Sequence, residues 1–197
     1  MSRIDGVPPR GAGVVTRGMY AWCKRMYGKV VEPLAVAAHH PRIAKGYSLF
    51  EWVVAQSHDV DEKLKDLAQT KAAALTGCEF CMDIASAVAS KSGATREQLI
   101  DLPRHRESPH FSELERLVLD YADGMTRTPV DVPDELFEQL RERFSERQLV
   151  ELTTAIAIEN YRARWNWAMG IGAQGFVGEG GFCVVPEGPA QRDGAAA

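Results

Sequence analysis

The start signals of three helices constrain this chain more than any other feature of its sequence. Each signal is a capping box, in which a Ser or Thr is followed three positions later by Glu or Gln, so that the two side chains satisfy free N–H groups at the helix start. The three boxes are Thr95–Gln98, Ser112–Glu115 and Ser145–Gln148. Apolar residues recur at helical spacing after these boxes and also over 14–30, 41–56 and 59–93, whereas no stretch alternates as a strand would. The sequence therefore predicts an all-α fold.

The length of the chain predicts a single domain with loosely attached ends. A chain of 197 residues buries about 70% of its unfolded surface on folding, which is enough for one core. We assign residues 14–176 to one helical domain and the Gly- and Pro-rich residues 1–13 to a flexible lead-in. Residues 177–197 form a glycine-rich tail. We expect the tail to begin as an extended segment packed on the domain or on a neighbouring subunit, and to end disordered.

Charge and hydropathy exclude two large classes of function. Lys and Arg number 23 against 27 Asp and Glu, which gives a net charge of −4. A weakly acidic chain does not predict binding to nucleic acid or to an anionic membrane surface, because both need clustered positive charge. No apolar run is long enough to span a membrane, and the N-terminal residues have no apolar signal-peptide region. We therefore expect a cytoplasmic protein.

Two of the four cysteines form a Cys-x-x-Cys motif, Cys78 and Cys81, at a predicted helix start. Residues three apart lie on one face of a helix, close enough to form a disulfide. A helix N-terminus also stabilises the reactive thiolate, which favours Cys78 as the thiolate. We therefore expect a dithiol that cycles between thiol and disulfide, with both sulfurs exposed enough to exchange electrons.

A zinc site is an alternative for the same two cysteines. His105 and His110 follow them with finger-like spacing. However, 23 residues separate Cys81 from His105, which is longer than the usual finger loop, and most of those residues are predicted to be helical. We expect neither a metal nor a cofactor.

The stretch LKDLAQTKAAALTGCEFCMDIASAVA, from residue 64 onward, resembles the AhpD-like alkylhydroperoxidase and carboxymuconolactone decarboxylase superfamily. It places an acid, Asp66, eleven residues before a Gly-Cys-x-Phe-Cys motif. The resemblance extends over about residues 40–176. It implies a helical fold assembled as homotrimers or hexamers, and it implies hydroperoxide reduction by the cysteine pair, which a dithiol partner protein then reduces again.

The resemblance also assigns roles to individual residues. It implies that Cys81 attacks the peroxide, that Cys78 resolves the product, and that Asp66 relays a proton. Asp66 is one methylene shorter than the usual glutamate, so its reach toward Cys78 needs a water. The family histidine falls at Ala85, which carries no proton. The histidines that remain to replace it are His58, His105 and His110.

Two other functions stay open. One is a lyase of the carboxymuconolactone decarboxylase type, although that chemistry uses no cysteine pair. The other is a non-enzymatic oligomer whose Cys-x-x-Cys motif switches its assembly.

The final predicted helix carries polar residues of undecided role. They form either a polar face with a salt bridge between subunits, or a wall of the thiol pocket through Arg164 or Asn166. Its segment 149–170 can also be laid over 64–85 as a weak internal repeat, which pairs Asn166 with Cys81. Of the remaining cysteines, we expect Cys23 to be an inert apolar residue, and Cys183 is a weaker candidate for a third redox thiol.

Overall fold

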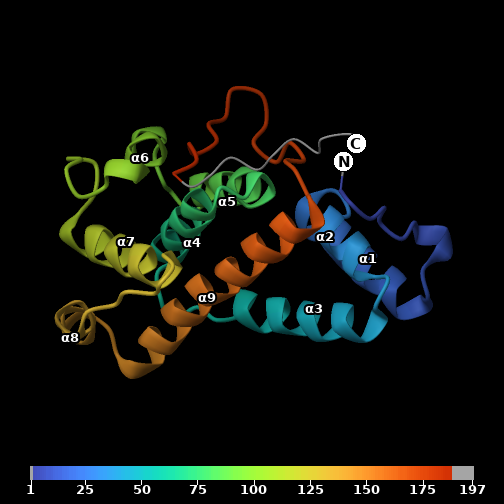
Figure 1. Ribbon diagram of the computed structural model, residues 1–197, viewed down its shortest axis with the longest axis horizontal. Coiled ribbons are helices and arrows are strands. Elements are labelled where there is room, and N and C mark those ends of the chain that lie inside the picture. Colours follow the sequence, from blue (N-terminus) through green and yellow to red (C-terminus); the bar gives the residue numbers. More distant parts are fainter. Residues whose placement is uncertain (1, 188–197) are drawn as a thin grey trace.

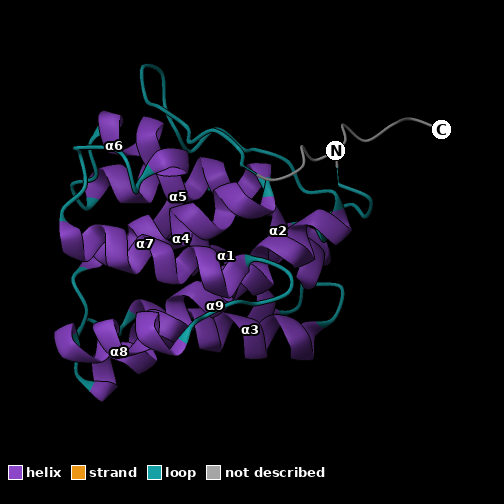
Figure 2. Cartoon of the chain, turned by 60° about the vertical axis from the view of Figure 1, so that its left-hand side comes forward, coloured by secondary structure: helices purple, strands orange, loops and turns teal. Residues whose placement is uncertain are grey.

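The computed structural model describes residues 2–187, and these residues confirm the all-α prediction (Figures 1 and 2). No strand occurs among them. The α-helices are α1 (Val14–Tyr27), α2 (Glu32–Ala37), α3 (Pro41–Ala55), α4 (Glu62–Thr76), α5 (Glu79–Lys91), α6 (Arg96–Asp101), α7 (Glu113–Thr126), α8 (Asp134–Arg143) and α9 (Glu146–Met169). Two short 3-10 segments, η1 (Pro9–Gly11) and η2 (Leu102–Arg104), complete the set.

The predicted start signals operate as expected. In all three capping boxes both reciprocal hydrogen bonds are present, at the starts of α6, α7 and α9. Asp61 caps α4 by accepting from the Leu64 N–H. Gly77 ends α4 with a φ of 67°, in the left-handed region that glycine adopts without strain. The chain therefore turns at Gly77 and starts α5 immediately afterwards.

Helix α4 lies at the centre of the packing, in contact with α5, α7 and α9. It has buried side chains on several faces: Leu67 packs in the core around α5, whereas Leu64 and Ala68 belong to the core that α7 and α9 share. In Figure 1, α9 crosses the molecule diagonally, with α4 and α5 on one side and α3 on the other. Because α4 is enclosed on several sides, it fixes where α5 begins.

The two segments of the proposed repeat have different backbones. Residues 64–85 form most of α4, the turn at Gly77 and the start of α5, whereas residues 149–170 lie in one uninterrupted helix, α9, up to its C-cap Gly170. The short helix α2 was not predicted, because its six residues are too few to show a period.

The chain after α9, including the described part of the tail, packs on α5. The Asp83 carboxylate accepts backbone N–H groups of Gln174, Phe176 and Val177 at 2.8–2.9 Å. Farther on, the buried ammonium group of Lys71 pairs with Glu187 at 2.6 Å. Figure 1 shows this segment passing over α5. Residues 188–197, where we expected disorder, lie outside the described part of the chain.

None of the helices within residues 2–187 combines the length and the apolar character that crossing a membrane requires.

Candidate active site

The cysteine pair occupies the turn between α4 and α5. Cys78 is the N-cap of α5, and its sulfur accepts a hydrogen bond from the Cys81 N–H at 3.3 Å. The Cα atoms of the two cysteines are 5.2 Å apart and their sulfurs form a disulfide. The turn is held from α9, because the Trp167 indole donates to the Thr76 carbonyl at 2.7 Å. The structure therefore holds the pair in its oxidised form at a helix start.

Both sulfurs are more deeply buried than the sequence predicted. Cys78 is 0% exposed and Cys81 is 1% exposed. The expectation of an exposed pair was wrong, because the packing of α9 and of the tail around α5 is not visible in local sequence. Access comes instead from a partly open cavity, which Cys81 lines.

Asn166 of α9 is the polar side chain nearest to the pair. Its amide group donates to the sulfur of Cys81 at 3.4 Å and lies 3.9 Å from that of Cys78. Of the two residues considered for the pocket wall, Asn166 lies there, but Arg164 is exposed and bonds to Asn160. An N–H donor at this distance stabilises a thiolate and lowers its pKa.

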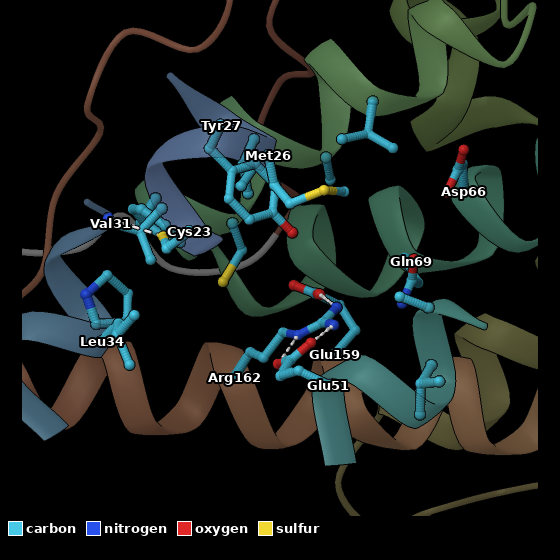
Figure 3. A pocket seen from close by; sticks show the side chains of 18 of the residues that line it. Cys23, Met26, Tyr27, Val31, Leu34, Glu51, Asp66, Gln69, Glu159 and Arg162 are labelled. Carbon is cyan, nitrogen blue, oxygen red and sulfur yellow. Dashed lines mark hydrogen bonds and ion pairs between the residues drawn. The ribbon is translucent and has the colours of Figure 1, made fainter. Parts of the chain in front are cut away.

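The cavity that Cys81 lines has a volume of about 450 Å³. Its walls come from α1, α2, α3, α4, α5 and α9 and are mostly apolar, with Trp22, Met26 and Phe80 among them. Figure 3 shows Met26 and Tyr27 on one side of this space and Arg162 with two glutamates on the other. A cavity of this size is typical of a site for a small organic molecule.

Asp66 also lines this cavity, from α4. Burial raises the pKa of its carboxyl group and the facing Ser92 hydroxyl lowers it, leaving the pKa above its usual value. In Figure 3 Asp66 lies at the end of the view away from Cys23. The structure thus brings Asp66 and Cys81 to one cavity, with Ser92 as the hydrogen-bonding neighbour of the acid.

A buried ion-pair cluster that was not predicted forms part of the cavity wall. Arg162 of α9 binds both carboxylate oxygens of Glu51 on α3, and it donates to Glu159 at 2.9 Å (Figure 3). Both of these ion-pair partners of Arg162 lie in its own chain. Burial raises the pKa of Glu51, but the charge and hydrogen bonds of Arg162 outweigh it and lower that pKa. Burial raises the pKa of Glu159 above its usual value.

The predicted histidine substitutes lie elsewhere. Among the described residues, no histidine lines the cavity. His58 pairs with Glu62 on the surface, His105 with Asp120, and His110 with Asp101. Within residues 2–187 no group of three or more potential ligands is placed to hold a metal ion, so the zinc alternative has no site there.

The two remaining cysteines have contrasting surroundings. Cys23 is free, buried and at the cavity wall, and burial raises the pKa of its thiol, which fits the inert residue we expected. Cys183 is free and exposed on the tail.

The fold and the site together define an all-helical protein with a dithiol at a helix start, of the AhpD-like kind. The chain belongs to the carboxymuconolactone decarboxylase family, whose model matches residues 41–124. It is 34% identical over 184 residues to the uncharacterized protein YnjA of Escherichia coli, with 92% of this chain and 98% of that protein covered.

Solved structures show the same fold. The debrominase Bmp8 superposes with a TM-score of 0.78 at 19% identity, over 88% of this chain and 93% of that one. A peroxidase-related protein from Ralstonia eutropha, described as an alkylhydroperoxidase AhpD core, gives a TM-score of 0.77 at 15% identity, over 88% and 92%. At these identities the likeness concerns the fold alone.

Proposed function

We propose that this protein is a cytoplasmic thiol peroxidase that reduces hydroperoxides with its cysteine pair. The observation that carries the proposal is the Cys78–Cys81 disulfide at the start of α5, with Cys81 at the wall of a mostly apolar pocket. The Cys81 thiolate attacks the terminal oxygen of the hydroperoxide and breaks the O–O bond. Cys81 becomes a sulfenic acid, and the other oxygen leaves as an alcohol or, from hydrogen peroxide, as water.

Cys78 completes the oxidative half of the cycle. Its thiol attacks the sulfur of the sulfenic acid, the disulfide forms, and water leaves. An external dithiol protein then reduces the disulfide by thiol–disulfide exchange and is itself oxidised. No cofactor enters these steps, and the reduced thiol pool of the cytoplasm supplies the electrons.

Two observations favour Cys81 over Cys78 as the attacking residue. Cys81 lines the cavity, and its sulfur lies closer to the Asn166 amide than that of Cys78 does. Cys78 accepts the Cys81 N–H as the helix cap, and this hydrogen bond would stabilise it as a leaving thiolate when the disulfide is reduced.

Asp66 is proposed as the proton carrier of the site. Its raised pKa brings the carboxyl group closer to the operating pH, as acid–base catalysis requires. We expect Asp66→Asn to lower peroxide turnover on the order of 100-fold. An acid whose pKa is raised by folding destabilises the folded state above its unfolded pKa, so the variant should be more stable than the wild type at pH 7 and equally stable at pH 3.

Urea denaturation at the two pH values, together with steady-state peroxide assays, checks both halves of this prediction. A variant of Asp61, which caps α4 at its exposed end, serves as the control: Asp61→Asn retains the cap, and we expect its turnover to stay unchanged. Unchanged turnover in Asp66→Asn would remove Asp66 from the mechanism.

The proposed activity is tested directly by mixing reduced protein with cumene hydroperoxide and dithiothreitol. We expect peroxide to be consumed in proportion to the protein, and mass spectrometry of the protein oxidised without dithiothreitol to show the loss of two hydrogen atoms from the peptide that contains both cysteines. Carboxymuconolactone is assayed in parallel. Lactone turnover without peroxide turnover would favour the decarboxylase alternative.

We further propose that the protein forms homo-oligomers through the outer face of α3. The inner face of this helix lines the cavity through Tyr47 and Glu51, whereas large apolar side chains are exposed elsewhere on it. These side chains are Ile43, Leu49, Phe50, Trp52 and Val53. A set of this size marks an interaction surface, and a second copy of the chain is the partner that the resemblance implies.

We expect Trp52→Glu, at a side chain that is 50% exposed, to shift the assembly to monomers in sedimentation velocity runs. The new charge would lose its water in an apolar interface without gaining a partner, which opposes assembly. Gln56→Glu, at the C-cap of the same helix, is the control and should leave the assembly intact. Runs with and without reductant address the redox-responsive oligomer, since that alternative alone requires the assembly to change size with the state of the disulfide.

A further inference from the structure

Two buried oxygen atoms at the cavity wall have no hydrogen-bond partner in the described part of the chain. They are Oε1 of Glu159 and Oδ1 of Asn166. Both residues are almost fully buried, at 3% and 2% exposed. Buried polar atoms are nearly always paired, because an unpaired one costs about 1–3 kcal/mol. Two such atoms in one cavity indicate that a bound molecule pairs with them.

The ion-pair cluster explains why Glu159 keeps a free oxygen. Arg162 directs two of its N–H groups at Glu51 and only one at Glu159, through Oε2. The single positive charge of Arg162 is therefore matched by Glu51, and Glu159 is the additional acid of the cluster. Figure 3 shows the Arg162 guanidinium group between the two carboxylates.

The two free oxygens are set apart along one helix. Glu159 and Asn166 are seven residues apart on α9, which corresponds to about 10 Å at 1.5 Å per residue. Asn166 is the residue at the sulfur of Cys81. The Glu159 oxygen therefore lies at a distance of about two helical turns from the reacting end, and the wall of the cavity is mostly apolar.

We propose, on the basis of the peroxidase function above, that the substrate is an elongated apolar hydroperoxide with a hydrogen-bond donor, an amine or an amide N–H, at its far end. The hydroperoxide O–H donates to Asn166 Oδ1 next to Cys81. The donor at the other end binds Oε1 of Glu159. The apolar middle of the molecule contacts the walls that α1 and α5 provide.

The test uses probes that carry no peroxide, so that binding is measured apart from catalysis. Calorimetry on the oxidised protein compares 4-phenylbutylamine, which offers only donors, with 4-phenylbutan-2-one, which offers only an acceptor. We expect the wild type to bind the amine at least about 10-fold more tightly, since a hydrogen bond to a charged group is worth about 1.5–3 kcal/mol.

Glu159→Gln gives the decisive comparison. Glutamine keeps the shape and can accept from Arg162 through its oxygen, which leaves its NH₂ donors toward the cavity. We expect the preference to reverse, so that the ketone binds more tightly than the amine. Glu138→Gln is the matched control, because Glu138 also pairs with an arginine, Arg141, but on the exposed surface of α8, and it should retain the wild-type preference.

Other outcomes overturn the proposal. An amine preference that survives Glu159→Gln but disappears in Asp66→Asn would locate the donor at the other cavity acid. Equal affinity of the wild type for the two probes would show that Glu159 does not select a donor. This measurement uses the wild-type protein alone, so it does not depend on whether a variant folds. The binding measurements use the protein with its disulfide closed, so they do not depend on turnover. A wrong prediction of the probe affinities therefore leaves the peroxidase assay unaffected, and an absence of peroxide turnover leaves the probe affinities unchanged.

Discussion

Replacing Cys81 by serine is expected to abolish peroxide turnover, with a loss of at least about 10³-fold, because the attacking group itself is removed. The fold should survive, since the serine hydroxyl can still accept the Asn166 N–H that now reaches the sulfur at 3.4 Å. The measurement is peroxide consumption with dithiothreitol as reductant, with circular dichroism as the check on folding.

Cys78→Ser should behave differently from Cys81→Ser. Its Cys81 can still reduce one equivalent of peroxide, but the sulfenic acid then has no resolving partner, so a single fast turnover should be followed by a slow phase limited by the external thiol. Cys183→Ser, at a free and exposed cysteine outside the cavity, is the control and should keep steady turnover. If Cys78→Ser turned over peroxide at the wild-type rate, the two-cysteine cycle would be wrong.

The second large effect concerns stability. Arg162→Met is expected to lower the free energy of unfolding by about 3 kcal/mol, because it leaves the buried Glu159 and the half-buried Glu51 without their cation. The loss should be smaller at low pH, because without Arg162 burial raises the pKa of both carboxyl groups, and once protonated they leave no charge unpaired. Urea denaturation at pH 7 and at pH 4 measures both values.

Arg164 provides the control for this prediction. It lies on the same helix two residues later but is exposed and bonded to Asn160, so Arg164→Met should change stability far less. The double variant Glu51→Gln/Arg162→Met should recover part of the stability that Arg162→Met loses, because the unpaired charge of Glu51 is gone. An equal loss in the Arg162 and Arg164 variants would show that the buried cluster contributes nothing beyond an ordinary surface pair.

The helices were predictable because their signals are local. The capping residues Thr95, Ser112 and Ser145 stand within a few positions of the residues they bond, so the starts of α6, α7 and α9 could be placed from the sequence. The same holds for the spacing of the cysteine pair, because its three-residue interval and the glycine turn before it are local features that bring the sulfurs together.

The rest of the site depends on contacts between distant segments. Glu51 and Arg162 are 111 residues apart, and neither has a local feature that points to the other. The burial of the cysteines depends on α9 and on the tail, which Asp83 holds through backbone groups of residues 174–177. The sequence indicated Asn166 as a candidate for the pocket wall, because it is a polar residue on an otherwise apolar helix. Its distance from Cys81, however, is set by tertiary packing alone.

The position of Cys78 couples electron transfer to the stability of a helix. Its sulfur is half of the disulfide and also the acceptor for the first turn of α5. Any change that frays this turn more in one oxidation state than in the other must shift the midpoint potential of the couple, even when it touches neither sulfur. Gly77→Ala, which strains the backbone just before the cap, would therefore tune the protein as an electron acceptor from outside its chemical centre.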